Sequence, residues 1–532
     1  MKLTFFGAAH AVTGSCHCVE ANRHKVLIDC GLQQGKDETD NRELDFAPSY
    51  IDDMVVTHAH IDHSGRIPLL VKQGFAGNIY CTRLTAQLLS IMLRDSAQIQ
   101  ENDAAYENQK GKRAGRPPVE PLYTLPDVEK ALRHIVTVEY GQEVDITDGI
   151  KIRFVDAGHL LGSACVEMWL TENGVTKKIV FSGDIGNKKT PIIRSPQPIC
   201  EADYVVTEST YGDRLHNVKE KPDYSAELAE VIDDTLSRGG NLVIPSFAVG
   251  RTQELLYFIR QIKEQHLVLS DPDFQVYVDS PLAGAATEIF SGDLTGYLDE
   301  DSAEKLRGGA LFRFPGLNIT ESTDESRGLN LDPQPKVIIS ASGMCDAGRI
   351  RHHLKYNLWR EECTIVFVGF QAPGTLGRTL LEGADTVRLF GEDVAVLAEI
   401  ENFKGLSSHA DRDHLLEWAQ SFENPTHFFV VHGDREVAPY FAESLEHLGL
   451  SAHAPQYTEV YDLANNCQLE RGYLPERRTV VTPTGKESGA YQRLAAVGKL
   501  LQEVILRSKG RTNKDMARLA DQIKQLIDKW EA

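Results

Sequence analysis

The sequence has few cysteines and no long apolar runs. Its nine cysteines are scattered through 532 residues, odd in number and never spaced as Cys-x-x-Cys, which is typical of a reducing compartment. Cys16 and Cys18 flank His17, but alternation along a strand sends His17 to the opposite face, so we interpret this trio as structural. No apolar run approaches the roughly 20 residues that span a bilayer. We therefore expect a cytoplasmic protein without a membrane anchor.

The sequence is also short of positive charge. Lysine and arginine number 56 against 77 aspartates and glutamates, which gives a net charge of −21. Because phosphate binding depends on Lys and Arg, this balance argues against a general nucleic-acid coat. A local basic groove is still allowed, and we interpret Lys110 to Arg116 as a loop that could contribute to one, although a lone charge run is usually a solvated face.

The length and the strand pattern of the chain predict several domains, because a typical domain has about 150 residues. Residues 1–207 hold many short strands and few helices, which indicates packed sheets covered by helices. Residues 208–395 alternate strands and helices regularly, which indicates a second α/β domain with a largely parallel sheet. Strands return in residues 396–475, beginning with a predicted strand over Val394–Ile400.

The tail, residues 476–532, is helical in pattern. Apolar residues recur there at helical spacing: Met516, Leu519, Ile523, Leu526, Ile527 and Trp530. A helix of this kind buries one face. Packing on the protein's own body or on a partner is the default interpretation, and a homodimer formed through this stripe is the hypothesis that it motivates.

The densest chemical motif is the run from Thr57 to Gly65, which reads Thr-His-Ala-His-Ile-Asp-His-Ser-Gly. Four metal-ligand side chains, His58, His60, Asp62 and His63, fall within six residues, between a short apolar strand and a helical pattern. Imidazole and carboxylate without thiolate suit zinc, and such open sites are more often catalytic than structural. The run is interpreted as half of a two-metal site.

The other ligands must come from other strand ends. His159, Asp184 and His432 each follow an apolar strand and have glycine beside them or close by. Any one of them alone would more often be a capping or loop residue. Together, in the same strand-end setting, they fit a dinuclear site.

These motifs resemble those of the metallo-β-lactamase superfamily, and specifically its β-CASP branch of RNA-processing nucleases. The match covers residues 1 to about 475 and has seven ordered motifs: Asp29 in Leu27–Gly31, the His58–His63 box, Gly158–Ser163, Ser182–Asp184, Glu208 in Thr207–Gly212, His409 in Leu406–Asp411, and His432 in Val431–Gly433. The compact boxes look more like those of the cleavage-and-polyadenylation nuclease type and its bacterial relatives than those of ribonuclease J.

The resemblance implies an α/β fold, an αβ/βα four-layer sandwich interrupted by a β-CASP domain. It implies two zinc ions, with manganese as the alternative, and Asp29 as a residue that orients ligands. The implied ligands are His58, His60 and His159 for one ion, Asp62, His63 and His432 for the other, and Asp184 as the bridge.

The implied activity is hydrolysis of phosphodiester bonds in single-stranded RNA by a two-metal-activated hydroxide. His409 would protonate the leaving oxygen and Glu208 would orient it, with Asp62 and Asp184 completing the catalytic set. An endonucleolytic cut is expected, and 5′ exonuclease action remains open. Expected RNA phosphate contacts are Ser340, Ser342, Gly343, Ser408 and Arg378.

Two other classes of protein remain in view. A small-substrate metallo-hydrolase of the thioester or lactam type would share the first box but would need neither the inserted domain nor Glu208 and His409. A non-catalytic RNA-processing scaffold would keep the fold and lose the ligands, yet every ligand is present. Zinc content separates the enzyme from the scaffold.

Overall fold

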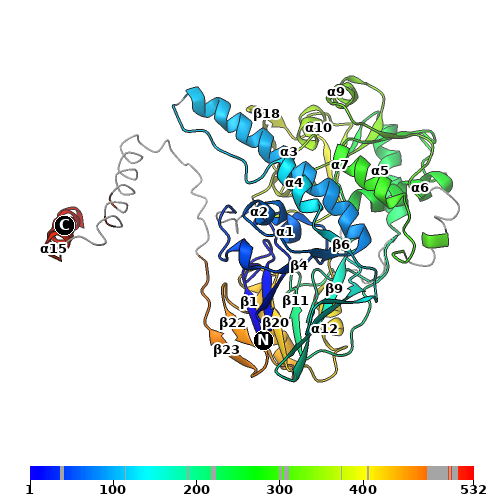
Figure 1. The fold of residues 1–532 in the computed structure, drawn as a ribbon. Helices are drawn as coiled ribbons and strands as arrows, with labels where there is room; N and C mark the ends of the chain where they lie inside the picture. The colour runs from blue at the N-terminus through cyan, green and yellow to red at the C-terminus, as the bar shows by residue number, and fades with distance from the viewer. Residues whose placement is uncertain are drawn as a thin grey trace. The chain divides into compact units, whose positions relative to one another are not determined.

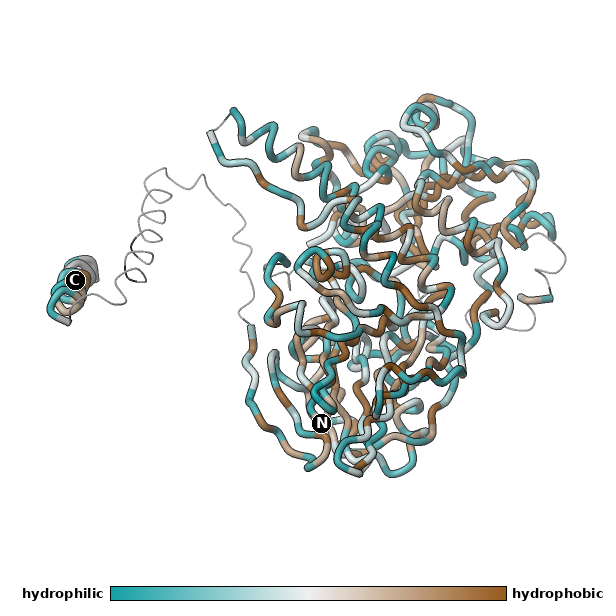
Figure 2. The backbone as a smooth tube through the Cα atoms, in the orientation of Figure 1, coloured by the Kyte–Doolittle hydropathy of each residue, from teal (hydrophilic) through white to brown (hydrophobic). Residues whose placement is uncertain are grey.

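The computed structural model describes residues 1–35, 41–113, 115–188, 191–216, 223–298, 302–304, 311–372, 374–403, 407–475, 501, 505 and 513–531. Met1–Arg477 form one compact unit and Arg478–Ala532 form another. Figure 1 shows the helices and strands of the first unit, and Figure 2 shows apolar residues concentrated along its inner segments.

The first sheet carries the first metal-ligand box at the end of one of its strands. Its strand order is β23-β22-β1-β2-β3-β4-β5-β6, with antiparallel pairing up to β3 and parallel pairing from β3 to β6. The strands are β1 (Lys2–Phe5), β2 (His17–Ala21), β3 (His24–Ile28), β4 (Asp53–Val55), β5 (Ile79–Cys81), β6 (Ile135–Thr137), β22 (Val460–Asp462) and β23 (Cys467–Glu470).

The second sheet has the order β21-β20-β11-β10-β9-β8-β7. Its strands are β7 (Glu143–Thr147), β8 (Ile150–Asp156), β9 (Ala164–Glu172), β10 (Val175–Phe181), β11 (Tyr204–Thr207), β20 (His427–Val430) and β21 (Ala452–His453). Along β8, buried residues alternate with half-buried ones, as expected of a strand with one face on a core.

The two sheets pack face to face, and helices cover their outer faces. Phe5 and Ile28 of the first sheet share a fully buried core with Phe154 and Phe429 of the second. The first sheet's other face is covered by α2 (Ile67–Lys72), α3 (Arg83–Arg113) and α4 (Leu125–Leu132), and the second sheet's by α12 (Arg412–Ala419) and α13 (Val437–His447). The predicted four-layer αβ/βα sandwich is confirmed.

A further α/β domain is inserted into the second sheet. The chain leaves this sheet at β11 and returns at β20, which pairs with β11 in parallel. The insertion carries a parallel sheet of order β14-β13-β15-β12-β16-β19 and the hairpin β17-β18, so the predicted parallel sheet is confirmed. Helix α3, which covers the first sheet, also contacts α7 (Pro281–Phe290) of this domain.

The strands of the inserted domain are β12 (Leu242–Pro245), β13 (Gln275–Val278), β14 (Leu317–Ile319), β15 (Lys336–Ser340), β16 (Thr364–Phe367), β17 (Thr386–Leu389), β18 (Glu392–Ala395) and β19 (Glu399–Asn402). Its helices are α5 (Tyr224–Ser237), α6 (Arg251–Glu264), α7 (Pro281–Phe290), α9 (Thr323–Leu331), α10 (Ile350–Asn357) and α11 (Leu376–Leu381).

Two local predictions are wrong. The single strand expected over Val394–Ile400 is two strands, because β18 pairs with β17 while β19 joins the parallel sheet beside β16. That sheet therefore extends past the predicted domain boundary at residue 395. The basic run from Lys110 was expected in a loop, but Lys110–Arg113 form the last turn of α3, where positive charge favours the helix C-terminus.

The second unit contains α15 (Asn513–Glu531). Met516 is exposed and Leu519 and Ile523 are half-buried. The side chains of Leu526, Ile527 and Trp530, which the predicted stripe includes, lie outside the described residues. No helix in the described part of the chain has the length and apolarity to cross a membrane.

Candidate metal centre

The predicted ligands converge at one edge of the two facing sheets. The first box follows β4, and its Asp62 and His63 lie in the short helix α1 (Ile61–Ser64). His159 follows β8, Asp184 follows β10 and His432 follows β20. Loops from three strands of the second sheet thus meet the loop from β4.

Asp184 lies at the middle of this cluster and divides it. Its Oδ2 is 3.4 Å from Nε2 of His58 and 3.5 Å from Nε2 of His159. Its Oδ1 is 3.1 Å from Nε2 of His63 and 3.6 Å from Nδ1 of His432. The carboxylate is 2 % exposed, and within the described residues Oδ1 accepts no hydrogen bond. A buried anionic oxygen left in this way is costly unless a cation neutralises it.

The imidazoles crowd together around Asp184. His60 Nδ1 lies 3.1 Å from His58 Nε2 and 3.2 Å from His159 Nε2. On the other side, His63 Nε2 lies 3.2 Å from His432 Nε2, and Asp62 Oδ2 is 3.5 Å from the same His432 atom. Two ligand groups, His58-His60-His159-Asp184 and Asp62-His63-His432, each fit around one ion. The donor set is that of a metal site.

The protonation states of the first group suit ligation. Burial lowers the pKa of His58 and, more strongly, that of His159, and it lowers the pKa of His60 to about 3. These rings are therefore neutral near pH 7, which is the form that binds metal. Burial also acts on His63, but the charges of Asp184 and Asp29 outweigh it and raise the His63 pKa. A bound cation would take the place of that proton.

Glycine and strained backbone bring the ligands close. A Cβ on Gly183, next to Asp184, would lie 2.7 Å from the Thr57 Cβ, and Gly183 has a φ of +55°, so only glycine lets the two loops meet here. Asp29 and His432 also have positive φ, at +60° and +50°. Such strain in non-glycine residues is concentrated at functional sites.

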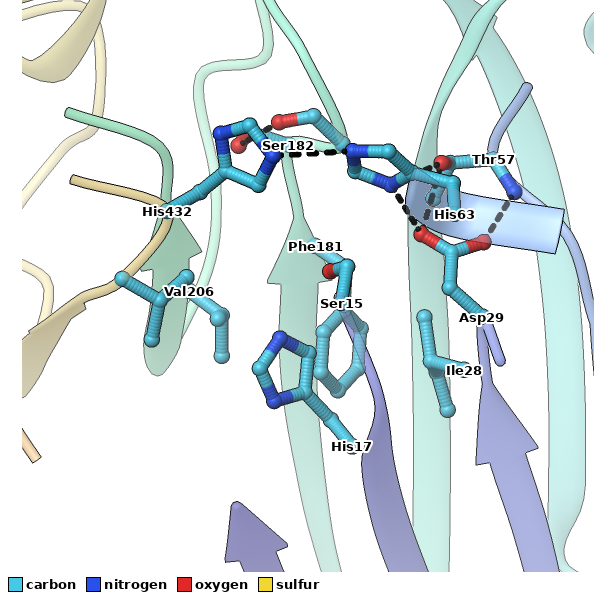
Figure 3. A pocket seen from close by; sticks show the side chains of 12 residues that line it. Ser15, His17, Ile28, Asp29, Thr57, His63, Phe181, Ser182, Val206 and His432 are labelled. Atoms are coloured by element: carbon cyan, nitrogen blue, oxygen red, sulfur yellow. Dashed lines mark hydrogen bonds and ion pairs between the residues drawn. The ribbon is translucent and has the colours of Figure 1, made fainter. Parts of the chain in front are cut away.

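Asp29 lies below the His63 ring and is hydrogen-bonded to it, as Figure 3 shows. Its Oδ2 accepts hydrogen bonds from Nδ1 of His63 at 2.7 Å and from Oγ1 of Thr57 at 2.8 Å. Its Oδ1 accepts from the backbone N–H of Thr57 at 2.8 Å. Because Asp29 holds a proton on Nδ1, His63 would offer the Nε2 lone pair to a bound cation. Thr57 is a member of this cluster that the sequence reasoning did not assign.

His17 lies beneath this layer with its ring against Phe181, whereas Cys16 and Cys18 face the outer core, so the predicted alternation on the strand is confirmed. Burial lowers the pKa of His17 to about 3, so the ring is neutral. It lines a cavity of about 10 Å³ shared with Asp29, His63 and His432.

His409 stands beside the cluster rather than in it. Its ring centroid lies 4.5 Å from that of His159, and its Nδ1 is 3.4 Å from Oε1 of Glu208. Glu208 is fully buried and also accepts hydrogen bonds from the backbone N–H groups of Ile185 and Thr210. Although Glu208 lies near Asp184 and His432, these bonds assign it to His409 rather than to an ion.

Glu208 sets the proton affinity of His409. Burial opposes the charged ring, but the charge of Glu208 and the hydrogen bond to it raise the His409 pKa to about 9. Glu208→Gln is therefore expected to drop this pKa below 6.5, since burial stays and the charge is removed. An NMR titration of the imidazole C–H signals in metal-free protein measures it, with Glu417→Gln as the exposed control. A His409 pKa that stays near 9 would assign the effect to Asp184 and Asp62 instead.

The residues expected to contact RNA phosphates differ in whether their polar groups are already hydrogen-bonded within the protein. The Ser340 hydroxyl is buried and donates to the Asp279 carbonyl at 2.8 Å, so its side chain is not free for RNA. The Ser408 carbonyl accepts from His159 Nδ1 at 3.2 Å, which fixes that ring's tautomer. Arg378 is half-exposed on α11, and its Nε donates to Glu382 across one helical turn. Ser342 and Gly343 lie in the loop after β15.

Comparison with known protein families places each part of the first unit. A metallo-β-lactamase superfamily domain matches residues 18–201. A Beta-Casp domain matches residues 252–380, within the insertion. A Zn-dependent metallo-hydrolase RNA specificity domain matches residues 393–455, a range that contains His409 and His432.

Relatives match across all three domains. A ribonuclease of Thermus thermophilus is 37% identical over 437 residues, which cover 82% of this chain and 94% of the relative. An RNase J-like protein of Methanocaldococcus jannaschii is 30% identical, over 83% of this chain and 95% of that one. The transcription termination factor FttA of Methanosarcina mazei is 30% identical, over 84% and 69%. The chain therefore belongs to the β-CASP family of the metallo-β-lactamase superfamily.

Proposed function

We propose that the protein is a zinc-dependent ribonuclease that hydrolyses phosphodiester bonds in single-stranded RNA. The observation that carries the proposal is the buried Asp184, whose two oxygens face two separate ligand groups, with the His409–Glu208 pair next to them. The ribonuclease among its relatives and the RNA specificity domain support RNA as the substrate. An endonucleolytic cut is proposed as the main mode, with 5′ exonuclease action as the second.

Two zinc ions are the proposed cofactors, with manganese as the alternative. His58, His60 and His159 would hold one ion, Asp62, His63 and His432 the other, and Asp184 both. Nitrogen and oxygen donors without thiolate support this choice. When bound, the ions supply Lewis-acid charge and a water of lowered pKa.

The chain's own residues supply the rest of the proposed chemistry. His409 holds a proton on the ring that Glu208 orients, and Nε2 delivers it to the leaving oxygen of the cut bond. Asp29 and Thr57 keep the His63 ring in one tautomer. Arg378, Ser342, Gly343 and the Ser408 loop are proposed contacts for flanking phosphates. A small-substrate hydrolase would have no use for a separate acid pair at this position.

The test uses matched single-stranded RNA and DNA, each labelled at either end, incubated with zinc-loaded protein. RNA-selective cleavage is expected. Internal cuts that give the same site from both labels support the endonuclease, whereas release of mononucleotides from the 5′ label supports the exonuclease. Intact polymers in the presence of two bound zinc ions would contradict the proposal and favour the small-substrate hydrolase.

The cellular setting is proposed from the thiols. All nine cysteines are free, and seven of them are buried. Free thiols in this number fit a reducing compartment, which supports a cytoplasmic site of action.

A homodimer through α15 is a further proposal, based on the apolar positions Met516, Leu519 and Ile523. Leu519→Glu is expected to convert the dimer to a monomer, because a charge inside an apolar helix contact is not solvated. Sedimentation equilibrium measures the mass, and Ala517→Glu, exposed on the same helix, is the control. Deletion of residues 476–532 should have the same effect, and a deletion that leaves the subunit number unchanged would refute the dimer.

A further inference from the structure

Aromatic side chains lie where loops of the inserted domain come near the metal centre. Phe247 is 50 % exposed and Phe370 is 47 % exposed, while Tyr211 is half-buried between Phe370 and His409. Exposed apolar residues that are scattered singly need no explanation. These three residues are not scattered, because the structure connects each of them to the next or to the same loop.

The inserted sheet brings the two phenylalanines to one edge. β12 ends at Pro245, two residues before Phe247, and β16 ends at Phe367, three residues before Phe370. β12 and β16 are parallel neighbours, so both rings lie at the carboxyl edge of the sheet. Ligands of open parallel α/β sheets bind outside this edge.

One loop joins the two rings. A Cβ on Gly343 would lie 3.1 Å from the Phe247 ring, so this ring covers the glycine. The carbonyl of Gly343 accepts a hydrogen bond from Nε2 of Gln371 at 2.9 Å. Gln371 is buried, and this anchor leaves its neighbour Phe370 turned to solvent. Phe247 and Phe370 therefore flank the same glycine loop.

The third aromatic residue, Tyr211, lies next to His409, the proposed general acid. The Tyr211 ring lies 6.4 Å from the Phe370 ring and 5.9 Å from the His409 ring, in both cases edge to face. The His409 ring in turn lies 4.5 Å from that of His159 in the metal cluster, with the two rings tilted. On the Phe247 side, Gly250 approaches Leu160, the residue after His159. The aromatic residues thus begin at the metal centre and end on exposed sheet-edge loops.

Because the protein is strongly acidic, its affinity for RNA must come from something other than net charge. With a net charge of −21, the chain has little general attraction for a polyanion. Base stacking on aromatic rings supplies sequence-tolerant affinity for single strands that does not depend on net charge, and it requires exposed rings. A duplex cannot use such rings, since its bases are already stacked on each other.

We propose that Phe370 and Phe247 form a base-stacking platform, on which consecutive bases of single-stranded RNA stack as the strand leaves the metal centre, with Tyr211 closing the inner end. The inference rests on the proposed function and adds to it the surface that selects single strands. Stacking, rather than base-specific hydrogen bonding, makes the selection tolerant of sequence.

The test compares Phe370→Leu with Phe370→Trp in the zinc-loaded full chain. Leucine keeps apolar bulk but has no aromatic face, so kcat/KM for a single-stranded RNA is expected to fall about 5- to 150-fold. Tryptophan keeps the face and should stay within about twofold. Trp359→Ala, 55 % exposed and located ahead of β16 at the opposite edge of the sheet, is the control and should leave cleavage unchanged.

RNA that lacks one base tests the stacking partner directly. Moving an abasic nucleotide along the strand should weaken cleavage by the unaltered protein at one or two positions, and Phe370→Leu should abolish the penalty at one of them, since the two changes remove the same contact. Zinc content and melting temperature check that each variant is folded. Equal kcat/KM for Phe370→Leu and the unaltered protein, or an abasic penalty that survives the substitution, would overturn the platform alone. No RNA cleavage by the unaltered protein would overturn the proposed function as well.

Discussion

Asp184→Asn is expected to lower RNA cleavage by about a thousandfold or more and to release bound metal. The two oxygens of Asp184 face different ligand groups, with Oδ2 toward His58 and His159 and Oδ1 toward His63 and His432. Asparagine replaces one of these oxygens with an amide nitrogen, which carries no negative charge and cannot bind a cation. One ligand group therefore loses its oxygen atom, and both groups lose the negative charge.

Metal analysis of the dialysed protein and single-turnover RNA cleavage measure the two effects of Asp184→Asn together. Asp223→Asn is the matched control, because it makes the same change at the N-cap of α5, where asparagine caps as well as aspartate. The control should keep both zinc ions and full activity. An Asp184→Asn protein that retains two ions and cleaves RNA normally would show that Asp184 does not bridge.

His409→Ala is expected to slow cleavage by about 10²- to 10⁴-fold while leaving the metal content unchanged. His409 is absent from both ligand groups, since its Nδ1 faces Glu208 and its ring lies beside His159. The substitution thus removes the proposed proton donor and keeps every ligand. Loss of activity together with loss of zinc would instead identify His409 as a ligand.

The pH profile separates an acid from a merely structural histidine. The folded protein holds the His409 pKa at about 9, above the usual 6.5, so the ring is charged below this value and loses its proton above it. A bound cation opposes the charged ring and moves the transition downward. Cleavage by the unaltered protein should therefore decline on the alkaline side, at or below about pH 9, and His409→Ala should lose this decline. His447→Ala, on the exposed end of α13, should keep the profile of the unaltered protein.

The candidate ligands could be predicted from the sequence, whereas one pair of strand boundaries could not. His58, His159, Asp184 and His432 were found because each follows an apolar strand, and strand ends can be read from local hydrophobic patterns. The break between β18 and β19 could not be read in this way. Val394 to Ala398 form one apolar run in sequence, and where the strands divide depends on which neighbour each half pairs with.

The sequence by itself predicted the candidate ligands, the inserted domain and the proposed acid pair, because short motifs in a fixed order carry these predictions. Only the tertiary structure decided which partners those residues have. Thr57 joins Asp29 to His63, Ser340 is occupied by Asp279, and Phe370 meets Tyr211 across more than a hundred residues of sequence. Contacts between segments so far apart depend on how sheets and loops pack, and packing is a property of the whole chain rather than of any local pattern.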